Sequence, residues 1–322
     1  MAALLPGGDA LDLARTLQSG QTFRWRWERG PGGGPVAVGV VGRDVFRLSQ
    51  DGRELWLIAP DTPGGRARLT EYLGVSPAAR RIPSIETALA ADPVVARVLA
   101  RTRGIGILAQ DPWEVLVSFI VSANNNIPKI CTSIDRLCRA LGAPLGEGAF
   151  AFPTPDRLAA ARSRMLAACL LGYRAPYVRA AARLIADGRL ELARLARMPL
   201  DTARERLLEI PGVGEKVADC TLLFGLRHTS AFPVDVWVRR AVERLYFRGR
   251  PRTARQIQEF ARERFGPLAG YAQQHLFCYA RAHLRPRADD APRRPPMRGD
   301  GGGARRPDRG ELGGYRAIVA NA

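Results

Sequence analysis

The distribution of apolar and polar positions divides the chain into a first part that predicts strands and a longer part that predicts helices. Four short runs rich in valine, leucine and aromatic residues lie at residues 22–27, 36–41, 44–49 and 54–59. The glycine- and proline-containing breaks between them favour antiparallel hairpins. We expect one short helix before the strands, over residues 9–19 with Gly20 as its C-cap, and a linker after them, over residues 60–66.

From about residue 76 onward the chain is punctuated as a series of helices. Asp111 is a good N-cap, and the proline after it suits the first helical position. Thr253 with Gln256 fits a capping box. The predicted helices begin at Pro112, cover 127–141, begin at Pro155, cover 175–187, run from Thr253 to about Phe265, and cover 267–284.

These patterns predict an α+β protein in which a small antiparallel N-terminal β-sheet domain packs on an all-helical domain. We expect the sheet domain at residues 1–75 and the helical domain at residues 76–284. An arginine-, proline- and glycine-rich tail follows at residues 285–322. The tail contains too few apolar residues to bury a core, and we expect it to be disordered.

The charge of the chain indicates its class of partner. The formal net charge is +18 and the sequence pI is about 11.0, which is typical of proteins that bind a polyanion, most often nucleic acid. A membrane partner is not expected, because no apolar run approaches the roughly 18 residues of a spanning helix and no basic amphipathic stripe stands out. The start of the chain lacks the pattern of a secretory signal. We expect a soluble intracellular protein, by default in a bacterial cytoplasm with the nucleoid, or nuclear if the source is eukaryotic.

The lysines are more informative than the arginines. Among 49 basic residues only Lys129 and Lys216 are lysines. An arginine stays protonated in proteins, whereas a lysine can lose its proton and act as an amine nucleophile. The five cysteines form no C-x-x-C pair and the chain has three histidines, so we expect no disulfide framework and no metal site.

Residues 207–219 (LLEIPGVGEKVAD) predict a helix, a tight turn and a second helix. Gly212, Val213 and Gly214 would form the hairpin, where glycines permit positive φ and a close approach of another backbone. The amides of such a turn and the helix N-terminus after it suit a DNA phosphate. This helix-hairpin-helix pattern also occurs in DNA-binding proteins that catalyse nothing. A noncatalytic binding module therefore stays an alternative.

Two residues near the hairpin suggest chemistry. Lys216 lies in the first turn of the second helix, where the helix dipole disfavours a cation and partial burial favours a neutral, nucleophilic amine. Asp235 follows nineteen residues later in the run FPVDVW and is expected at the start of the next helix. Amides and the dipole would keep its carboxylate ionised there. Without the lysine motif, an ordinary N-cap is the preferred interpretation of Asp235.

A lysine-bearing hairpin followed by a Pro-x-Asp loop is similar to the helix-hairpin-helix–Gly/Pro–Asp DNA glycosylase superfamily. Four further motifs resemble its 8-oxoguanine DNA glycosylase branch, namely SGQTFRW (19–25), ANNNI (123–127), GYRA (172–175) and AGYAQQHLF (269–277). Together these motifs cover residues 10–284 in the family's order. The resemblance implies a monomeric base-excision-repair DNA glycosylase and AP lyase that needs no cofactor. Its implied partner is duplex DNA containing 8-oxoguanine opposite cytosine.

The resemblance also implies a mechanism. Lys216 would attack C1′ of the damaged nucleotide, form a Schiff base with the sugar and cleave the strand 3′ to the abasic site by β-elimination. Asp235 would stabilise positive charge on the sugar and help to deprotonate Lys216. An alternative in the same fold is a glycosylase for another lesion, such as alkylated purines, although alkylpurine glycosylases lack the catalytic lysine.

By the same resemblance, the flipped base would occupy a pocket whose floor and walls come from distant motifs. The Gly20 carbonyl would accept the N7–H that distinguishes 8-oxoguanine from guanine, Gln273 would bind the pairing edge, and Phe277 would stack on the base. Gln273 and Phe277 are four residues apart, hence on one helix face. Cys220, one turn after Lys216, would line the other side.

Another set of residues is implied to hold the orphaned cytosine and the distorted duplex. Asn124 would fill the vacated space, Tyr173 would wedge into the stack, and Arg174 would contact the cytosine edge. Lys129 stands where better-known members carry arginine. Two features depart from related proteins. Trp237 replaces the histidine that animal members place near the flipped nucleotide's phosphate, and the four-cysteine iron–sulfur loop of related branches is absent.

Overall fold

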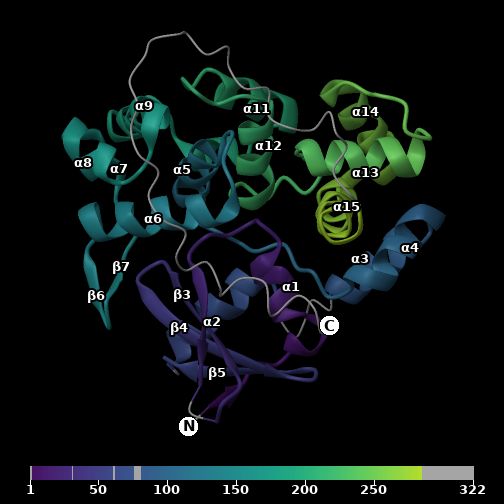
Figure 1. Cartoon of the computed structure of the whole chain (residues 1–322), viewed down its shortest axis with the longest axis horizontal. Coiled ribbons are helices and arrows are strands. Elements are labelled where there is room, and N and C mark those ends of the chain that lie inside the picture. The colour runs from purple at the N-terminus through teal and green to yellow at the C-terminus, as the bar shows by residue number, and fades with distance from the viewer. Residues whose placement is uncertain (1, 31, 61, 76–80, 285–322) are drawn as a thin grey trace, which may run out of the picture. The chain divides into compact units, whose positions relative to one another are not determined.

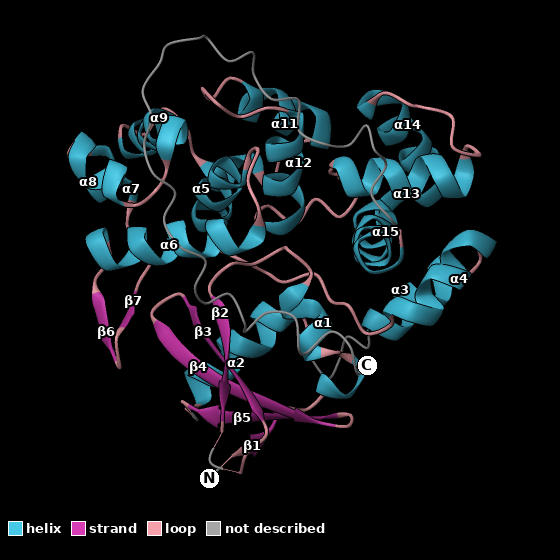
Figure 2. Cartoon of the chain, viewed as in Figure 1, coloured by secondary structure: helices cyan, strands magenta, loops and turns pink. Residues whose placement is uncertain are grey.

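The structure is a computed structural model that describes residues 2–30, 32–60, 62–75 and 81–284. Its N-terminal part contains a five-stranded antiparallel sheet with the order β1-β5-β4-β3-β2 (Figures 1 and 2). The strands are β1 (Ala3–Leu4), β2 (Trp25–Arg29), β3 (Pro35–Val41), β4 (Asp44–Asp51) and β5 (Glu54–Ala59). Three of the four predicted strands lie where they were expected. The first strand begins at Trp25 and not at Thr22.

Tight turns and one apolar face fix the register of this sheet. Val41 pairs with Asp44, and the two-residue turn between them contains Gly42 at φ 62°. The alternation of strands β4 and β5 puts one set of side chains on the buried face. Helix α2 (Pro63–Leu73) packs against that face. The buried set consists of Phe46, Leu48, Leu55 and Leu57 from the sheet and Leu69, Tyr72 and Leu73 from the helix.

Three predictions for this part are wrong, and side-chain caps explain two of them. The helix predicted at 9–19 is divided into a 3₁₀ turn, η1 (Gly8–Ala10), and a helix, α1 (Leu13–Gln18), because the Asp12 carboxylate accepts from Arg15 N at 2.8 Å and starts a new helix. Ser19 and not Gly20 is its C-cap. The predicted linker at 60–66 contains the start of helix α2, because Thr62 accepts from Gly65 N.

The remaining described residues are mostly helical, which confirms the predicted α+β class (Figure 2). One short hairpin, β6 (Pro144–Gly146) with β7 (Ala149–Phe150), was not predicted. The helices are α3 (Arg81–Leu89), α4 (Pro93–Thr102), α5 (Pro112–Ser122), α6 (Ile127–Leu141), α7 (Pro155–Ala159), α8 (Ser163–Ala168), η3 (Gly172–Arg174), α9 (Ala175–Ala186), α10 (Leu192–Leu195), α11 (Leu200–Leu208), α12 (Glu215–Phe224), α13 (Val236–Tyr246), α14 (Ala254–Phe265), η4 (Gly266–Leu268) and α15 (Ala269–His283).

The helices form two packed groups with separate apolar cores. In one group every residue of α5 from Trp113 to Ser122 except Glu114 is buried, and α5 packs on α6, α9 and α12 (Figure 1). In the other group α15 packs on α4, α13 and α14. The loop from the end of α12 to the start of α13 joins the two groups.

The segment between α1 and β2 is tied to the loop before α5 and to helix α15. The Gln21 side chain donates to Gly106 O at 2.9 Å and accepts from Leu108 N at 2.8 Å, and Gln274 of α15 donates to Ser19 O at 2.9 Å. This segment is therefore held against α15. The predicted division of domains at residue 75 stays a prediction, and the predicted tail at 285–322 lies outside the described residues. Within the described ranges, no helix has the length and apolar character to cross a membrane.

Candidate active site

The predicted hairpin lies between α11 and α12. Gly212 has φ 82°, and a Cβ on it would lie 2.3 Å from the Tyr177 ring, so this position requires glycine on both grounds. Val213 is buried, and its N–H donates to Ile210 O at 3.0 Å. The backbone of the hairpin is thus tightly determined, and the Val213 amide is already used inside the turn.

The N-terminus of α12 is open. Its N-cap, Gly214, offers no side chain to the helix amides, and a Cβ on Gly214 would meet nothing within 4 Å. The first amides of a helix have no intrahelical acceptor and carry the positive end of its dipole. The exposed Gly212 and Gly214 therefore flank a surface that suits an anion such as a DNA phosphate.

Lys216 lies in the first turn of α12, as predicted, and is half-buried. Its Nζ donates to Ser122 Oγ at 2.8 Å and stands 4.7 Å from the Phe119 ring centroid. Both contacts come from the last turn of α5. The amine is thus held at a defined point where the α5 and α12 helices meet.

Asp235 is the N-cap of α13, as predicted, and accepts from Trp237 N at 3.0 Å and Val238 N at 2.8 Å. Burial raises the pKa of this carboxyl above its ordinary value, while the backbone hydrogen bonds and the charges of Lys216 and Arg281 lower it. Burial has the larger effect. The pKa of Asp235 is therefore raised, whereas capping alone would lower it, and Asp235 binds its proton more tightly than an ordinary aspartate does.

Cys220 is buried one turn after Lys216 and lies within electrostatic range of Lys216 and Asp235. Burial raises the pKa of its thiol to about 12 against the lowering effect of Lys216. Cys220 therefore presents a neutral, apolar thiol beside the lysine and the aspartate, which suits a wall of a pocket.

The three other residues of the predicted base pocket meet along α15. Gly20 has φ 76°, and a Cβ on it would lie 3.2 Å from the Phe277 ring. Gln273 donates to Pro233 O at 3.2 Å, two residues before Asp235. The buried Oε1 of Gln273 has no hydrogen-bond partner among the described residues. Helix α15 thus joins the Gly20 turn to the Asp235 loop and offers one unused acceptor between them.

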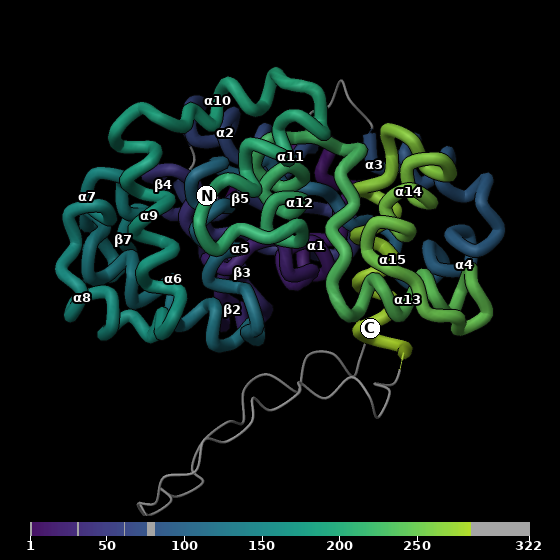
Figure 3. The backbone as a smooth tube through the Cα atoms, turned by 90° about the horizontal axis from the view of Figure 1, so that it is seen from above, coloured from purple at the N-terminus to yellow at the C-terminus, as the bar shows by residue number. Residues whose placement is uncertain are grey.

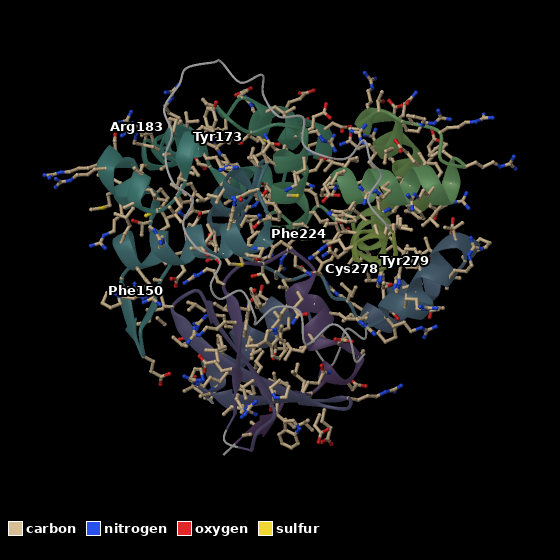
Figure 4. The ribbon with its side chains drawn as sticks, in the orientation of Figure 1. Phe150, Tyr173, Arg183, Phe224, Cys278 and Tyr279 are labelled. Atoms are coloured by element: carbon tan, nitrogen blue, oxygen red, sulfur yellow. The ribbon has the colours of Figure 1, made fainter. Side chains whose placement is uncertain are left out.

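Three of the four residues predicted for the orphaned cytosine are also brought together. Tyr173 Oη donates to Ala123 O at 3.2 Å and lies 3.4 Å from Asn124 Nδ2, and Arg174 donates to the Ala123 and Asn124 carbonyls. Tyr173 is 54% exposed and is labelled in Figure 4, whereas Arg174 is buried. Lys129 is exposed on α6, and among the described residues no side-chain contact joins it to this group.

Sequence reasoning missed several residues around the site. Ser122 and Phe119 hold the Lys216 amine, and the only sequence signal for Ser122 is its position next to the ANNNI motif. Arg281 lies one turn after Phe277, with its guanidinium 5.4 Å from that ring centroid. The i, i+4 spacing that related Gln273 to Phe277 extends to Arg281 and could have identified it.

The structure therefore combines an open helix-hairpin-helix turn, the amine of Lys216 and the partly buried carboxylate of Asp235. Residues 117–267 match the HhH-GPD superfamily of base excision DNA repair proteins, and residues 4–116 match the N-terminal domain of 8-oxoguanine DNA glycosylase.

Individual relatives agree with these two matches. A probable N-glycosylase/DNA lyase of Methanothermobacter thermautotrophicus is 38% identical over 59% of this chain and 68% of the relative. The N-glycosylase/DNA lyase of Saccharomyces cerevisiae is 31% identical over 73% of this chain and 68% of the relative. A solved structure of the Clostridium acetobutylicum 8-oxoguanine glycosylase/lyase, in complex with duplex DNA containing cytosine opposite 8-oxoguanine, is 34% identical. It covers 84% of this chain and 92% of that chain, with a TM-score of 0.78.

The fold and the site thus define a base-excision DNA repair protein with the helix-hairpin-helix architecture. Within that class, the chain belongs to the 8-oxoguanine DNA glycosylase family of the HhH-GPD superfamily, and it is a DNA glycosylase with AP lyase activity.

Proposed function

We propose that the enzyme removes 8-oxoguanine opposite cytosine from duplex DNA through a Schiff base on Lys216, and then cleaves the strand 3′ to the abasic site by β-elimination. One observation carries the proposal. The Lys216 amine is fixed by Ser122 and lies in the electrostatic field of the partly buried Asp235 carboxylate, and the turn at Gly20 packs against the Phe277 ring of α15.

In the proposed first step, Nζ of Lys216 forms a bond to C1′ while the bond from C1′ to the base breaks and its electron pair leaves with the base. Loss of the amine proton and opening of the sugar ring give the protonated Schiff base. Removal of a C2′ proton then moves an electron pair toward C3′, the C3′–O bond breaks, and the 3′ phosphate leaves. Such a step needs an unprotonated amine, which an arginine cannot supply because its guanidinium stays protonated in proteins.

Asp235 has two tasks in this proposal. Its carboxylate stabilises the positive charge that develops on the sugar as the base leaves, and it accepts a proton from the Lys216 amine. The two amides of α13 fix the carboxylate before the substrate arrives, so no reorganisation is needed during the reaction. Preorganised charges of this kind contribute about 3–4 kcal/mol to transition-state stabilisation.

Base selection would rest on the pocket residues. The target base must leave the duplex, because its C1′ is inaccessible within the stack. The Gly20 carbonyl would accept the N7–H of 8-oxoguanine, whereas guanine presents an acceptor there and would be repelled. The unused Oε1 of Gln273 would accept from the pairing edge, and Phe277 would stack on the base.

Duplex binding would use the rest of the predicted set. Asn124, Tyr173 and Arg174 would fill the vacated space and contact the cytosine, with Lys129 at its edge. The open N-terminus of α12 at Gly214 would bind a backbone phosphate. The net charge of +18 would make the affinity strongly salt-dependent. The monomeric state and the bacterial cytoplasmic location stay predictions.

Borohydride trapping combined with base release tests this proposal. Duplexes carrying 8-oxoguanine, guanine, uracil or 3-methyladenine opposite cytosine are compared, and 8-oxoguanine is also placed opposite each other base. We expect base release and a trapped adduct with 8-oxoguanine opposite cytosine, and neither with Lys216→Gln. An adduct with 3-methyladenine alone would contradict the substrate, and base release by Lys216→Gln at the full rate would contradict the mechanism.

A further inference from the structure

Arg281 lies beside Phe277, at the edge of the proposed base pocket. It lies on α15 one turn beyond Phe277, and its exposed side chain places the guanidinium 5.4 Å from the Phe277 ring centroid. The positive charge of Arg281 also interacts with the carboxyl of Asp235 and lowers its pKa. Arg281 is therefore close both to the surface on which the base would stack and to the carboxylate that would face the sugar.

Among the described residues, no carboxylate lies within salt-bridge distance of the Arg281 guanidinium, in contrast to several other arginines of the chain. Arg15 pairs with Asp12 at 3.2 Å, Arg24 pairs with Glu114 at 2.9 Å, and Arg174 donates to main-chain carbonyls. Within the described residues, Arg281 forms neither a salt bridge nor a side-chain hydrogen bond, and its guanidinium lies against the Phe277 ring. A cation left in this state beside a DNA-repair site is available to an anion.

We propose that Arg281 binds the backbone phosphate of the flipped nucleotide and so fixes that nucleotide in the pocket. This inference rests on the proposed function. A nucleotide whose base stacks on Phe277 and whose C1′ faces Lys216 carries its own phosphate only a few bonds away, at the rim where Arg281 stands. A guanidinium offers two parallel N–H donors that match two phosphate oxygens.

Trp237, in the first turn of α13, cannot supply the positive charge that would bind this phosphate. Trp237 carries one neutral N–H donor, and its ring is covered by the Arg240 guanidinium at 4.5 Å. Asp235, two residues earlier, is negatively charged when ionised and repels a phosphate. An additional cation on α15 therefore balances the negative charge that the Asp235 carboxylate places at the mouth of the pocket.

The first test measures the salt dependence of binding. Lys216→Gln protein, with and without Arg281→Gln, is titrated against an 8-oxoguanine duplex, because the lysine substitution prevents cleavage. We expect Arg281→Gln to weaken binding about tenfold and to reduce the slope of log affinity against log salt by about 1. Arg281→Lys keeps a cation and should keep most of the slope.

Arg194→Gln is the matched control. Arg194 lies on α10 and is paired with Glu191, and Figure 3 shows α10 at the opposite edge of the described chain from the C-terminal end of α15. We expect this variant to leave both the affinity and the slope unchanged. Equal losses in Arg281→Gln and Arg194→Gln would indicate a general effect of charge and would overturn the inference.

The second test removes the charge from the DNA. A neutral methylphosphonate replaces the phosphate 5′ or 3′ to the lesion, one at a time. At one of these positions the tenfold difference in affinity between Arg281→Gln and its parent should disappear, because the neutral DNA has already lost the contact with Arg281. Persistence of the difference at both positions would overturn the assignment. Failure of wild-type protein to release 8-oxoguanine would instead overturn the proposed function, whereas a normal release rate and salt slope in Arg281→Gln would overturn only the role of Arg281.

Discussion

The N-termini of α12 and α13 both present free amides and a positive dipole end, but only the N-terminus of α13 is capped by a side chain. Each helix start presents amides without intrahelical acceptors and the positive end of a dipole. At α13 the protein fills this position with its own carboxylate, since Asp235 accepts from two amides. At α12 the N-cap is Gly214, which contributes no side chain, and the space beside it is empty.

This difference separates the two tasks of the enzyme in physical terms. The closed helix start fixes a partly buried negative charge in electrostatic range of Lys216, where the proposed chemistry needs it. The open start leaves amides available on the surface, where the proposed function places a backbone phosphate of DNA. The proposed function therefore predicts that closing α12 impairs binding, whereas neutralising the cap of α13 impairs catalysis.

The largest expected effect is on catalysis at α13. Asparagine is as good an N-cap as aspartate but carries no charge, so Asp235→Asn should keep the helix and lose the proposed electrostatic role. We expect the single-turnover excision rate to fall by about 10³-fold, with the free energy of unfolding nearly unchanged. Asp235→Ala should show the same loss of rate and an additional loss of about 1 kcal/mol of stability. Equal rates for Asp235→Asn and wild type would contradict the role of the charge.

A second carboxylate, Asp219, is buried within α12, and its effect can be measured through the stability of the protein. Asp219 pairs with Arg204 of α11 at 2.8 Å and accepts from Gln258 of α14, yet burial raises its pKa from 3.8 to about 6. The folded state thus holds the proton more tightly than the unfolded chain. This contribution to stability is complete below pH 3.8 and is lost as the pH rises toward 6.

We therefore expect the difference in unfolding free energy between wild type and Asp219→Asn to change by about 2 kcal/mol from pH 3.8 to pH 6, with wild type losing stability relative to the variant. Urea unfolding at several pH values measures this difference. The comparison cancels other groups, including the buried His275, whose pKa is lowered to about 4 and which titrates in both proteins. A difference independent of pH would contradict the assignment.

Closing the open helix start should have a smaller effect. The φ of Gly214 is −98° and its side-chain space is empty, so Gly214→Asp introduces an N-cap without strain. We expect a gain of a few tenths of a kcal/mol in stability and about a tenfold loss of affinity for undamaged duplex, because the new carboxylate occupies the phosphate site and repels the phosphate. Gly214→Asn separates occupation of the phosphate site from charge repulsion, because asparagine caps the helix without carrying a charge. Unchanged affinity in Gly214→Asp would exclude this helix start as a phosphate site.

The smallest expected effect is a shift in pH dependence. Because burial raises the pKa of Asp235, the excision rate should begin to fall on acidification at a higher pH than an ordinary aspartate near 3.8 would give. Single-turnover rates across this range measure the acid limb, which should be absent from the residual activity of Asp235→Asn. An acid limb at the same pH in both proteins would assign it to another group.

The local parts of this comparison could be predicted from sequence. The glycines of PGVG predicted the hairpin, and the positions of Lys216 and Asp235 at helix starts followed from their neighbours. Local capping was also missed twice, because Asp12 and Thr62 begin helices inside segments that were assigned to one helix and to a linker.

The contacts that hold the site could not be predicted, because they join residues distant in sequence. Ser122 and Lys216 are 94 positions apart, and Ser19 and Gln274 are 255 positions apart. No local pattern encodes such pairs. The same limit applies to the electrostatics of Asp235, where capping suggested a stabilised carboxylate but burial among the packed helices has the larger influence on its pKa.

The most direct test of the account identifies the amine that bonds to the sugar. The borohydride-trapped adduct with an 8-oxoguanine duplex is digested, and the modified peptide is sequenced by mass spectrometry. The chain has two lysines, so the assignment is unambiguous. The account predicts the sugar remnant on Nζ of Lys216. A remnant on Lys129 or on the N-terminal amine would contradict it.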